Sequence, residues 1–231
     1  MPALPNPSDL GRIPLFSGLS SEQLSWLNDH LHLRVFPAGF NIVLVEQPGE
    51  VIYIVLAGTV KIYVDRLDGT EVILAILGPG DTVGELSLLD SAGRSANVIT
   101  MTECSFLWMD RTTFWECLRS MPPLTYKLVE EVCARLRLAN EQIQALATLD
   151  IEGRVARQIL ATAQRYGQVT ATGDIQVPIR LTQSDIAGLV GASRERVNQV
   201  IVMFKQHKYI SIDQNSQITV HNREALVRRC Q

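Results

Sequence analysis

Apolar positions change their spacing along the chain, and each change predicts a different kind of element. Leucines over residues 19–31 recur at helical spacing, and either of two serines before them can cap that helix. Residues 33–109 form short runs of Val, Ile and Leu separated by Gly and Pro, and residues 60–65 alternate with period two. Residues 67–70 contain Asp-Gly, which predicts a hairpin turn. This spacing of strands and turns predicts a β-barrel or jelly roll.

The pattern becomes helical after residue 110. A short helix is expected over about residues 110–119, and Pro122-Pro123 ends it. Residues 124–149 contain neither Gly nor Pro and predict one long helix. Its apolar positions step by three and four over about three heptads, which favours a two-stranded coiled coil and a homodimer over packing on its own domain. These positions are Val129, Val132, Leu136, Ala139, Ile143 and Leu146.

The C-terminal residues predict a second set of short helices. Asp150 can cap a helix that Gly167 ends near residue 166. Thr182 and Asp185 have the spacing of a capping box, which predicts a further short helix after them. Gly191 then makes a turn.

A second helix is expected after that turn. Ser193 can cap it, and it extends to about Gln206. Two short helices joined by a tight turn form a helix-turn-helix. Residues 209–213 and 217–221 flank a polar turn and predict a small β-wing.

Charge is distributed unevenly between the first 150 residues and the rest of the chain. The net charge is −3 over the whole chain, but residues 151–231 carry 11 Lys and Arg against 6 Asp and Glu. The first 150 residues are therefore acidic and the rest is basic, which points to a polyanion as partner of the C-terminal part.

The cysteines, the histidines and the N-terminal residues argue against several classes of protein. The four cysteines contain no C-x-x-C pair, and none precedes Cys104, which argues against an iron–sulfur cluster and a disulfide scaffold. The four histidines are not placed as haem or metal ligands. Because no signal peptide or spanning segment is recognisable, we expect a cytoplasmic protein with no membrane partner.

One loop, residues 80–97, combines groups suited to a phosphate and a ribose. Gly84 lets backbone N–H groups approach an anion closely. Arg94 offers a charged fork for phosphate oxygens, and Ser95 adds donors. Glu85 can accept a hydrogen bond from a ribose hydroxyl. We expect Arg94 to be an exposed loop charge whose removal leaves the fold intact.

This loop resembles the phosphate-binding cassette of cyclic-nucleotide-binding domains, and the helix-turn-helix resembles that of the cyclic-AMP receptor protein (CRP/FNR) family of transcription regulators. The resemblance covers almost the whole chain and departs from the family pattern at Val83 and Gly93. It implies that Glu85 binds the ribose and that Arg94 and Ser95 bind the cyclic phosphate. Backbone contacts are implied at Gly84 and Leu86.

The family's base-binding positions on the central helix correspond to Ala139 and Asn140. The resemblance implies that Asn140 contacts the base of the nucleotide. Ala139 has no hydrogen-bonding side chain, which removes one contact with the base. The effector expected from the resemblance is cAMP, while another nucleotide or a pocket that binds none stays open.

The second helix of the helix-turn-helix carries the expected DNA-reading residues. By resemblance, Arg194 and Glu195 read a G·C-containing half-site, whereas Gln199 replaces a base-reading Arg of the family and predicts an altered preference. The residues expected to bind or position phosphates are Thr182, Gln183, Ser193 and Arg196.

The sequence therefore predicts an α+β protein with three parts. Residues 1–122 form a cyclic-nucleotide-binding sensor, residues 123–149 a dimerisation helix, and residues 150–231 a winged helix-turn-helix domain. The function expected is a homodimeric regulator that binds palindromic double-stranded DNA under control of cAMP and contacts RNA polymerase. Alternatives are a ligand-independent DNA-binding regulator and a regulatory subunit of an enzyme. No catalytic constellation or metal-ligand spacing is recognisable, so the chain is not expected to be an enzyme.

Overall fold

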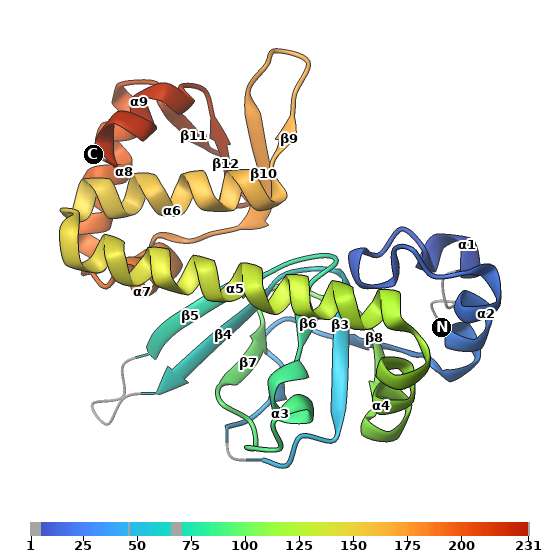
Figure 1. The fold of residues 1–231 in the computed structure, drawn as a ribbon. Helices are drawn as coiled ribbons and strands as arrows, with labels where there is room; N and C mark the ends of the chain where they lie inside the picture. The colour runs from blue at the N-terminus through green and yellow to red at the C-terminus, as the bar shows by residue number, and fades with distance from the viewer. Residues whose placement is uncertain (1–5, 46, 66–70, 231) are drawn as a thin grey trace. The chain divides into compact units, whose positions relative to one another are not determined.

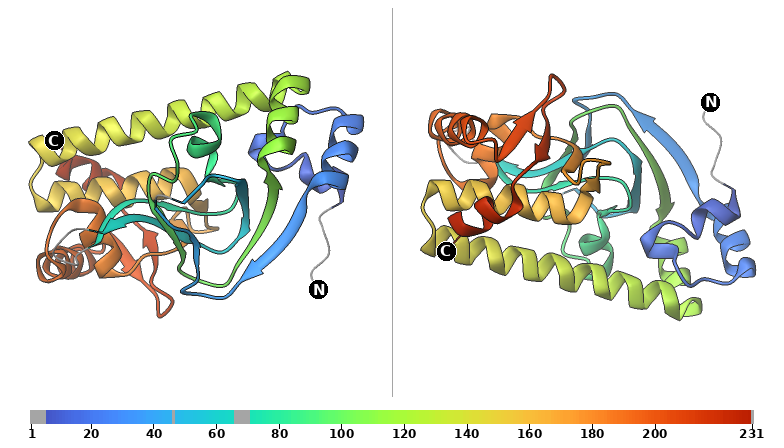
Figure 2. Two further views of the ribbon diagram at one scale, coloured as in Figure 1. Left: turned by 90° about the horizontal axis from the view of Figure 1, so that it is seen from below. Right: turned by 90° about the horizontal axis from the view of Figure 1, so that it is seen from above.

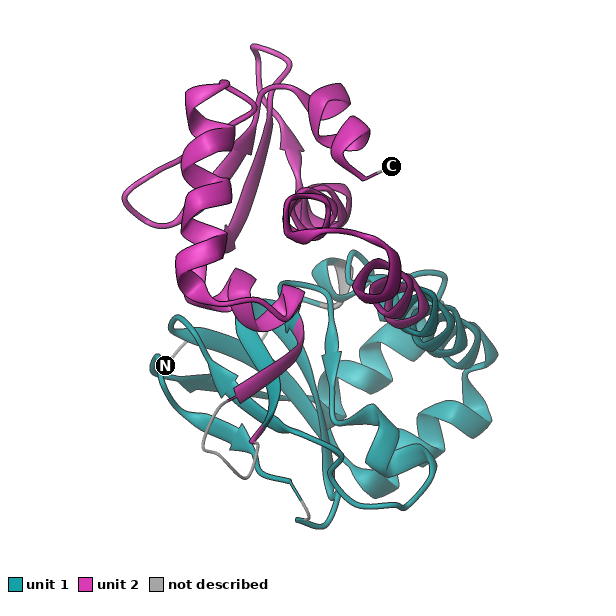
Figure 3. Ribbon diagram, turned by 90° about the vertical axis from the view of Figure 1, so that its left-hand side faces the viewer, with its two compact units in different colours: residues 1–64, 76–137 teal, residues 65–75, 138–231 magenta. Residues whose placement is uncertain are grey.

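A computed structural model describes residues 6–45, 47–65 and 71–230 and divides the chain into two compact units. The first unit contains residues 1–64 and 76–137, and the second contains residues 65–75 and 138–231 (Figure 3).

The first unit begins with short helical segments that cover one end of its core. These are α1 (Pro7–Leu10), a 3₁₀ turn (Pro14–Phe16) and α2 (Ser21–His30). Ser20 caps α2 through a reciprocal box with Gln23, which confirms the helix expected in this region.

Two four-stranded antiparallel sheets form the N-terminal part of the chain (Figure 1). Their strands belong to the first unit except at residue 65 and residues 71–75, which are counted with the second unit. One has the order β1-β8-β3-β6 and the other β2-β7-β4-β5. The short alternating runs of the sequence thus become two facing layers, as a jelly roll requires. The Asp-Gly turn expected at residues 67–70 lies outside the described residues. The strands are β1 (His32–Phe36), β2 (Asn41–Val43), β3 (Val51–Ala57), β4 (Val60–Asp65), β5 (Glu71–Leu77), β6 (Thr82–Val83), β7 (Asn97–Thr100) and β8 (Cys104–Asp110).

The core of this unit joins the sheets to the helices that flank them. Ile54 of β3 pairs in register with Leu107 of β8, and both side chains are fully buried. Phe114 from α4 (Arg111–Ser120) packs into the same cluster, together with Leu124 and Leu128. The N-terminal part of the long helix is therefore anchored in the sensor core.

The long helix α5 (Pro122–Thr148) begins at the prolines that were expected to separate it from α4 (Figure 2). Proline is favoured in the first turn of a helix because the N–H it lacks would be unpaired there. Beyond Leu128, the apolar positions of the predicted heptad seam are largely exposed in the single chain. The exposed fractions are 54% for Val129, 61% for Leu136, 66% for Ile143 and 48% for Leu146.

The second unit contains the expected helix-turn-helix and wing. Asp150 caps α6 (Ile151–Tyr166) by accepting from the Gly153 N–H at 2.8 Å. The helix-turn-helix consists of α7 (Gln183–Val190) and α8 (Arg194–Gln206). A four-stranded sheet of order β11-β12-β10-β9 completes the wing. Its strands are β9 (Gln168–Val169), β10 (Ile175–Arg180), β11 (Ile210–Ile212) and β12 (Gln217–Val220).

Two parts of this unit were not expected from the sequence. The segment after Gly167, where no strand was expected, forms the β9–β10 hairpin. The last helix, α9 (Arg223–Arg229), packs on α6, where the Arg229 guanidinium donates to Glu152 at 2.8 Å. Residues 175–180 do alternate between apolar and polar positions, so the signal for β10 was present and was missed. The other two elements, β9 and α9, have only two and seven residues, which is too short for a clear period.

Burial along α8 predicts that two substitutions on this helix differ clearly in their effect on the free energy of unfolding. Phe204→Ala should lower the free energy of unfolding by about 3–5 kcal/mol, because a fully buried ring leaves a cavity. Val202→Ala, at a side chain that is 43% exposed, should change it by about 0.5 kcal/mol or less. Chemical denaturation followed by circular dichroism measures both, and equal losses would contradict the packing described here.

Candidate functional site

The cassette loop turns into α3 (Glu85–Leu89) through a left-handed glycine. Gly84 has φ +90°, a conformation that L side chains rarely adopt. A Cβ at this position would overlap Nη1 of Arg94. Glycine is therefore required here both by the backbone turn and by the closeness of the guanidinium.

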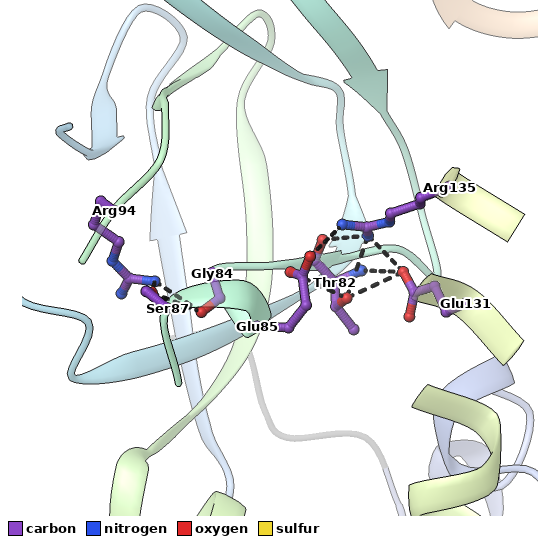
Figure 4. Close-up of polar contacts among 7 residues, drawn as sticks. All are labelled: Thr82, Gly84, Glu85, Ser87, Arg94, Glu131 and Arg135. Atoms are coloured by element: carbon purple, nitrogen blue, oxygen red, sulfur yellow. Dashed lines mark hydrogen bonds and ion pairs between the residues drawn. The ribbon is translucent and has the colours of Figure 1, made fainter. Parts of the chain in front are cut away.

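Arg94 is buried, not exposed as the sequence suggested, with 7% of its surface accessible. Its Nη1 donates to the Gly84 carbonyl and the Ser87 hydroxyl, both at 2.9 Å (Figure 4). Its Nη2 donates to the Val51 carbonyl at 2.8 Å. The expectation of a dispensable loop charge is wrong, because the guanidinium ties β3, Gly84 and α3 together.

The partners of Arg94 are all uncharged. No carboxylate among the described residues lies within ion-pair distance of its guanidinium, and burial lowers the pKa of Arg94 from its usual value. Three hydrogen bonds leave two of its five N–H groups available. A buried cation without a counter-ion favours an anionic ligand such as a phosphate.

Glu85 is the first residue of α3 and is 3% exposed. Its Oε1 accepts from Arg135 Nη1 at 2.7 Å, so an arginine of α5 holds the cassette acid (Figure 4). Burial raises the pKa of Glu85, and the positive charge of Arg135 opposes this shift. The carboxylate thus has one charged partner inside a desolvated site.

Arg135 is the centre of a network that sequence reasoning missed. Its Nη2 donates to the Thr82 carbonyl at 2.6 Å and to Glu131 Oε1 at 2.5 Å. The i, i+4 spacing of Glu131 and Arg135 was the available signal, but such pairs are usually solvated on helix surfaces. Arg135 Nε is buried and has no hydrogen-bond partner among the described residues. This free donor beside Glu85 suits a polar ligand with a hydroxyl group.

The other expected pocket residues are less constrained. Leu86 of α3 is 46% exposed, and Ser95 is exposed directly after Arg94. Asn140 is exposed on α5 in the part of the helix that belongs to the second unit. The structure therefore joins Gly84, Glu85 and Arg94 around α3, while a base contact by Asn140 stays a prediction.

The helix-turn-helix is held by the caps that its sequence predicted. The Thr182 hydroxyl accepts from the Asp185 N–H at 3.2 Å, and Asp185 Oδ2 accepts from the Thr182 N–H at 2.9 Å. Gly191 ends α7 with φ +61°, and the Ser193 hydroxyl caps α8. The Thr182 hydroxyl belongs to this capping box, and a contact of Thr182 with a DNA phosphate stays a prediction.

One face of α8 is buried and the other presents polar side chains. Val197, Val200, Ile201 and Phe204 face the core. The side chains of Arg194, Glu195, Arg196 and Gln199 are exposed and have no hydrogen-bond or ion-pair partner in the described parts of the chain. This face has the donor and acceptor groups that read base edges.

Comparison with known proteins agrees with both the cassette and the helix-turn-helix. Residues 33–121 match the family model of the cyclic nucleotide-binding domain, and residues 153–229 match that of the Crp-like helix-turn-helix domain. A CRP-like cAMP-activated global transcriptional regulator of Mycobacterium tuberculosis is 36% identical over 95% of this chain and 97% of its own. The chain belongs to the CRP family of transcription regulators.

Further relatives extend this assignment. The cyclic AMP receptor protein of Thermus thermophilus is 30% identical over 81% of this chain and 83% of its own. Among solved structures, FixK2 from Bradyrhizobium japonicum has a TM-score of 0.75 at 21% identity, covering 87% of this chain and 98% of that one. The catabolite activator protein of Thermus thermophilus has a TM-score of 0.52 at 26% identity, covering 94% and 98%. The expected family and fold class are confirmed.

The family is one of regulators and not of enzymes, as the sequence indicated. In the described parts of the chain, no helix is long and apolar enough to cross a membrane. The same residues contain no group of three His, Cys, Asp or Glu side chains that could hold a metal ion.

The glycine at the cassette turn gives a matched test of the Arg94 pocket. Gly84→Ala should strain the left-handed backbone and displace Arg94, so that affinity for cyclic nucleotide falls at least tenfold in a calorimetric titration. Gly39→Ala has similar strain at φ +79° but meets nothing within 4 Å. It should lower stability by about 1–2 kcal/mol without changing affinity. Equal affinities of the two variants would contradict the clash.

Proposed function

We propose that this protein is a homodimeric DNA-binding regulator whose DNA affinity is controlled by a cyclic nucleotide, and that the nucleotide is cAMP. The observation that carries the proposal is the buried Arg94 guanidinium, which has no carboxylate partner and lies against the left-handed turn at Gly84. A buried cation of this kind suits an anion and fits the cyclic phosphate of such a ligand.

The acid beside that pocket supports a ribose contact. Glu85 is buried and paired with Arg135, whose Nε lacks a partner among the described residues. A ribose hydroxyl placed between them can donate to the carboxylate and accept from Nε. Since Arg135 belongs to α5, ligand binding at Glu85 would change forces on the helix that leads to the second unit.

The choice of cAMP as the ligand rests on the relatives of this protein and on the side-chain amide of Asn140. The Mycobacterium tuberculosis relative, 36% identical, is named as cAMP-activated. Asn140 can both donate to and accept from the edge of adenine, whereas Ala139 offers no side-chain hydrogen bond. We expect Ser95 to bind the phosphate, and the backbone at Leu86 to complete the site.

The exposed apolar positions of α5 support a dimer. Val129, Leu136, Ile143 and Leu146 lie at heptad spacing and are each about half exposed or more in the single chain. Such a seam is unfavourable in water and is covered when two copies of the helix pack together. Residues 123–149 are thus assigned to dimerisation, residues 1–122 to sensing and residues 150–231 to DNA binding.

DNA contacts are assigned to α8 and its approaches. In a dimer, the two α8 helices would enter successive major grooves of a palindromic site about 34 Å apart. We expect Arg194, Glu195 and Gln199 to read bases, and Ser193 and Arg196 to hold phosphates. A contact with RNA polymerase stays a prediction.

A second candidate is a regulator that binds DNA without a nucleotide. The pairing of Glu85 with Arg135 favours it, because the acid already has a charged partner in the structure. Direct titration with cAMP distinguishes the two functions.

We expect purified, nucleotide-free protein to bind cAMP at micromolar affinity or better, near one per subunit, and more tightly than cGMP. Arg94→Lys keeps the charge but loses the planar fork, so affinity should fall at least tenfold. Arg111→Lys, at an arginine that contacts Gly49 and Ser91 instead, should bind like the wild type. Isothermal calorimetry measures all three, and absence of binding by the folded wild type would favour the ligand-independent regulator.

Two substitutions in α5 test the proposed dimer. Leu136→Glu places a charge in the proposed seam and should shift the protein to monomers in sedimentation equilibrium. Leu138→Glu introduces the same charge two residues away, off the heptad positions, and should stay dimeric. A dimer of unchanged affinity in Leu136→Glu would place the interface elsewhere.

A further inference from the structure

One hydrogen bond joins the two helices of the helix-turn-helix at their exposed side. Gln183 is the first residue of α7, and Asn198 lies in the second turn of α8. The Gln183 Nε2 donates to Asn198 Oδ1 at 2.8 Å. Asn198 is exposed and Gln183 is half-buried, so the pair is open to a partner in solution.

In the structure this bond turns Oδ1 of Asn198 toward Gln183 and leaves the NH₂ group of Asn198 without a partner among the described residues. A free asparagine can turn its amide by half a rotation and offer either its oxygen or its NH₂ group. With Oδ1 held by Gln183, the remaining NH₂ group is a donor. The arrangement makes Asn198 a donor toward any ligand that approaches α8.

Asn198 also lies where a base reader must lie. It is one helical turn after Arg194, so the two side chains share a face of α8. The core residues Val197, Val200 and Ile201 point the other way. Its donor is therefore placed beside the arginine that is assigned to base reading.

The pair is not needed to hold the fold. The start of α7 is already capped by the reciprocal box of Thr182 and Asp185. An amide pair at the surface adds little to stability. The hydrogen bond between Gln183 and Asn198 is better explained by its effect on the orientation of the Asn198 amide.

We propose that Gln183 is a positioning residue that makes Asn198 a donor-only reader of the major groove. The pair would select a base that presents a carbonyl acceptor to Asn198, which is guanine through O6 or thymine through O4. This inference rests on the proposed binding of DNA through α8, and it replaces the simple phosphate contact expected of Gln183.

The test is a selection of binding sites from randomised DNA with four proteins. Gln183→Lys keeps a donor toward Asn198 Oδ1, so the base preference of the wild type should be retained. In Gln183→Glu the carboxylate accepts from the Asn198 NH₂ group, which turns Oδ1 toward DNA. Preference at one position per half-site should then move, by about tenfold, to bases that present an amino group, adenine or cytosine.

Ser184→Glu is the matched control for charge. Ser184 is exposed on the next residue of α7, and its substitution adds the same negative charge without touching Asn198. It should weaken binding to all sites similarly and keep the preference. Thermal unfolding of each variant checks that the domain stays folded.

A second measurement uses the selected site itself. Gln183→Ala, Asn198→Ala and the double variant form a cycle, and the double variant should lose about as much affinity as Asn198→Ala alone. Additive losses, or an unchanged preference in Gln183→Glu, would overturn this inference and leave DNA binding through α8 intact. A wild type that selects no sequence would overturn both.

Discussion

The buried charge of Arg94 is the constraint on which the sensor unit depends. A guanidinium that is 7% exposed and lies beside no carboxylate is costly unless its donors are used. Here they bind the carbonyls of Gly84 and Val51 and the hydroxyl of Ser87, so the charge connects the turn, the strand and the short helix. The glycine at the turn follows from this closeness. Two N–H groups of the same guanidinium have no partner in the described parts of the chain, which suits the anion proposed as its ligand.

A second buried charge links this site to the long helix. Glu85 and Arg135 pair at 2.7 Å, and Arg135 also holds Glu131 and the Thr82 carbonyl. Because breaking a buried pair leaves an uncompensated charge, a ligand that takes Glu85 must supply new partners for both groups. The effect reaches α5 directly, since Arg135 is one of its residues. Under the proposed function, these two side chains would couple ligand occupancy to the state of the helix.

The DNA-binding unit follows a different principle. Its helices are defined by local caps at Asp150, Thr182 and Ser193, and its sheet and core hold them together. The reading face of α8 is free of partners within the described chain except where Gln183 holds Asn198. Base contacts need side chains that are held in position but still have unused hydrogen-bonding groups. The capped helices and the sheet provide the position, and the exposed face of α8 provides the unused groups.

The sequence by itself determined the elements whose signals are local. Caps, left-handed glycines and heptad spacing act over a few residues, so the helix-turn-helix, the long helix and the cassette turn at Gly84 could be predicted. Tertiary structure alone decided the burial of Arg94, the pairing of Glu85 with Arg135 and the contact of Gln183 with Asn198. In each case the partners are 7 to 50 residues apart, in different elements. Side-chain identity states which bonds a residue can make, but the folded chain decides which partner comes within reach.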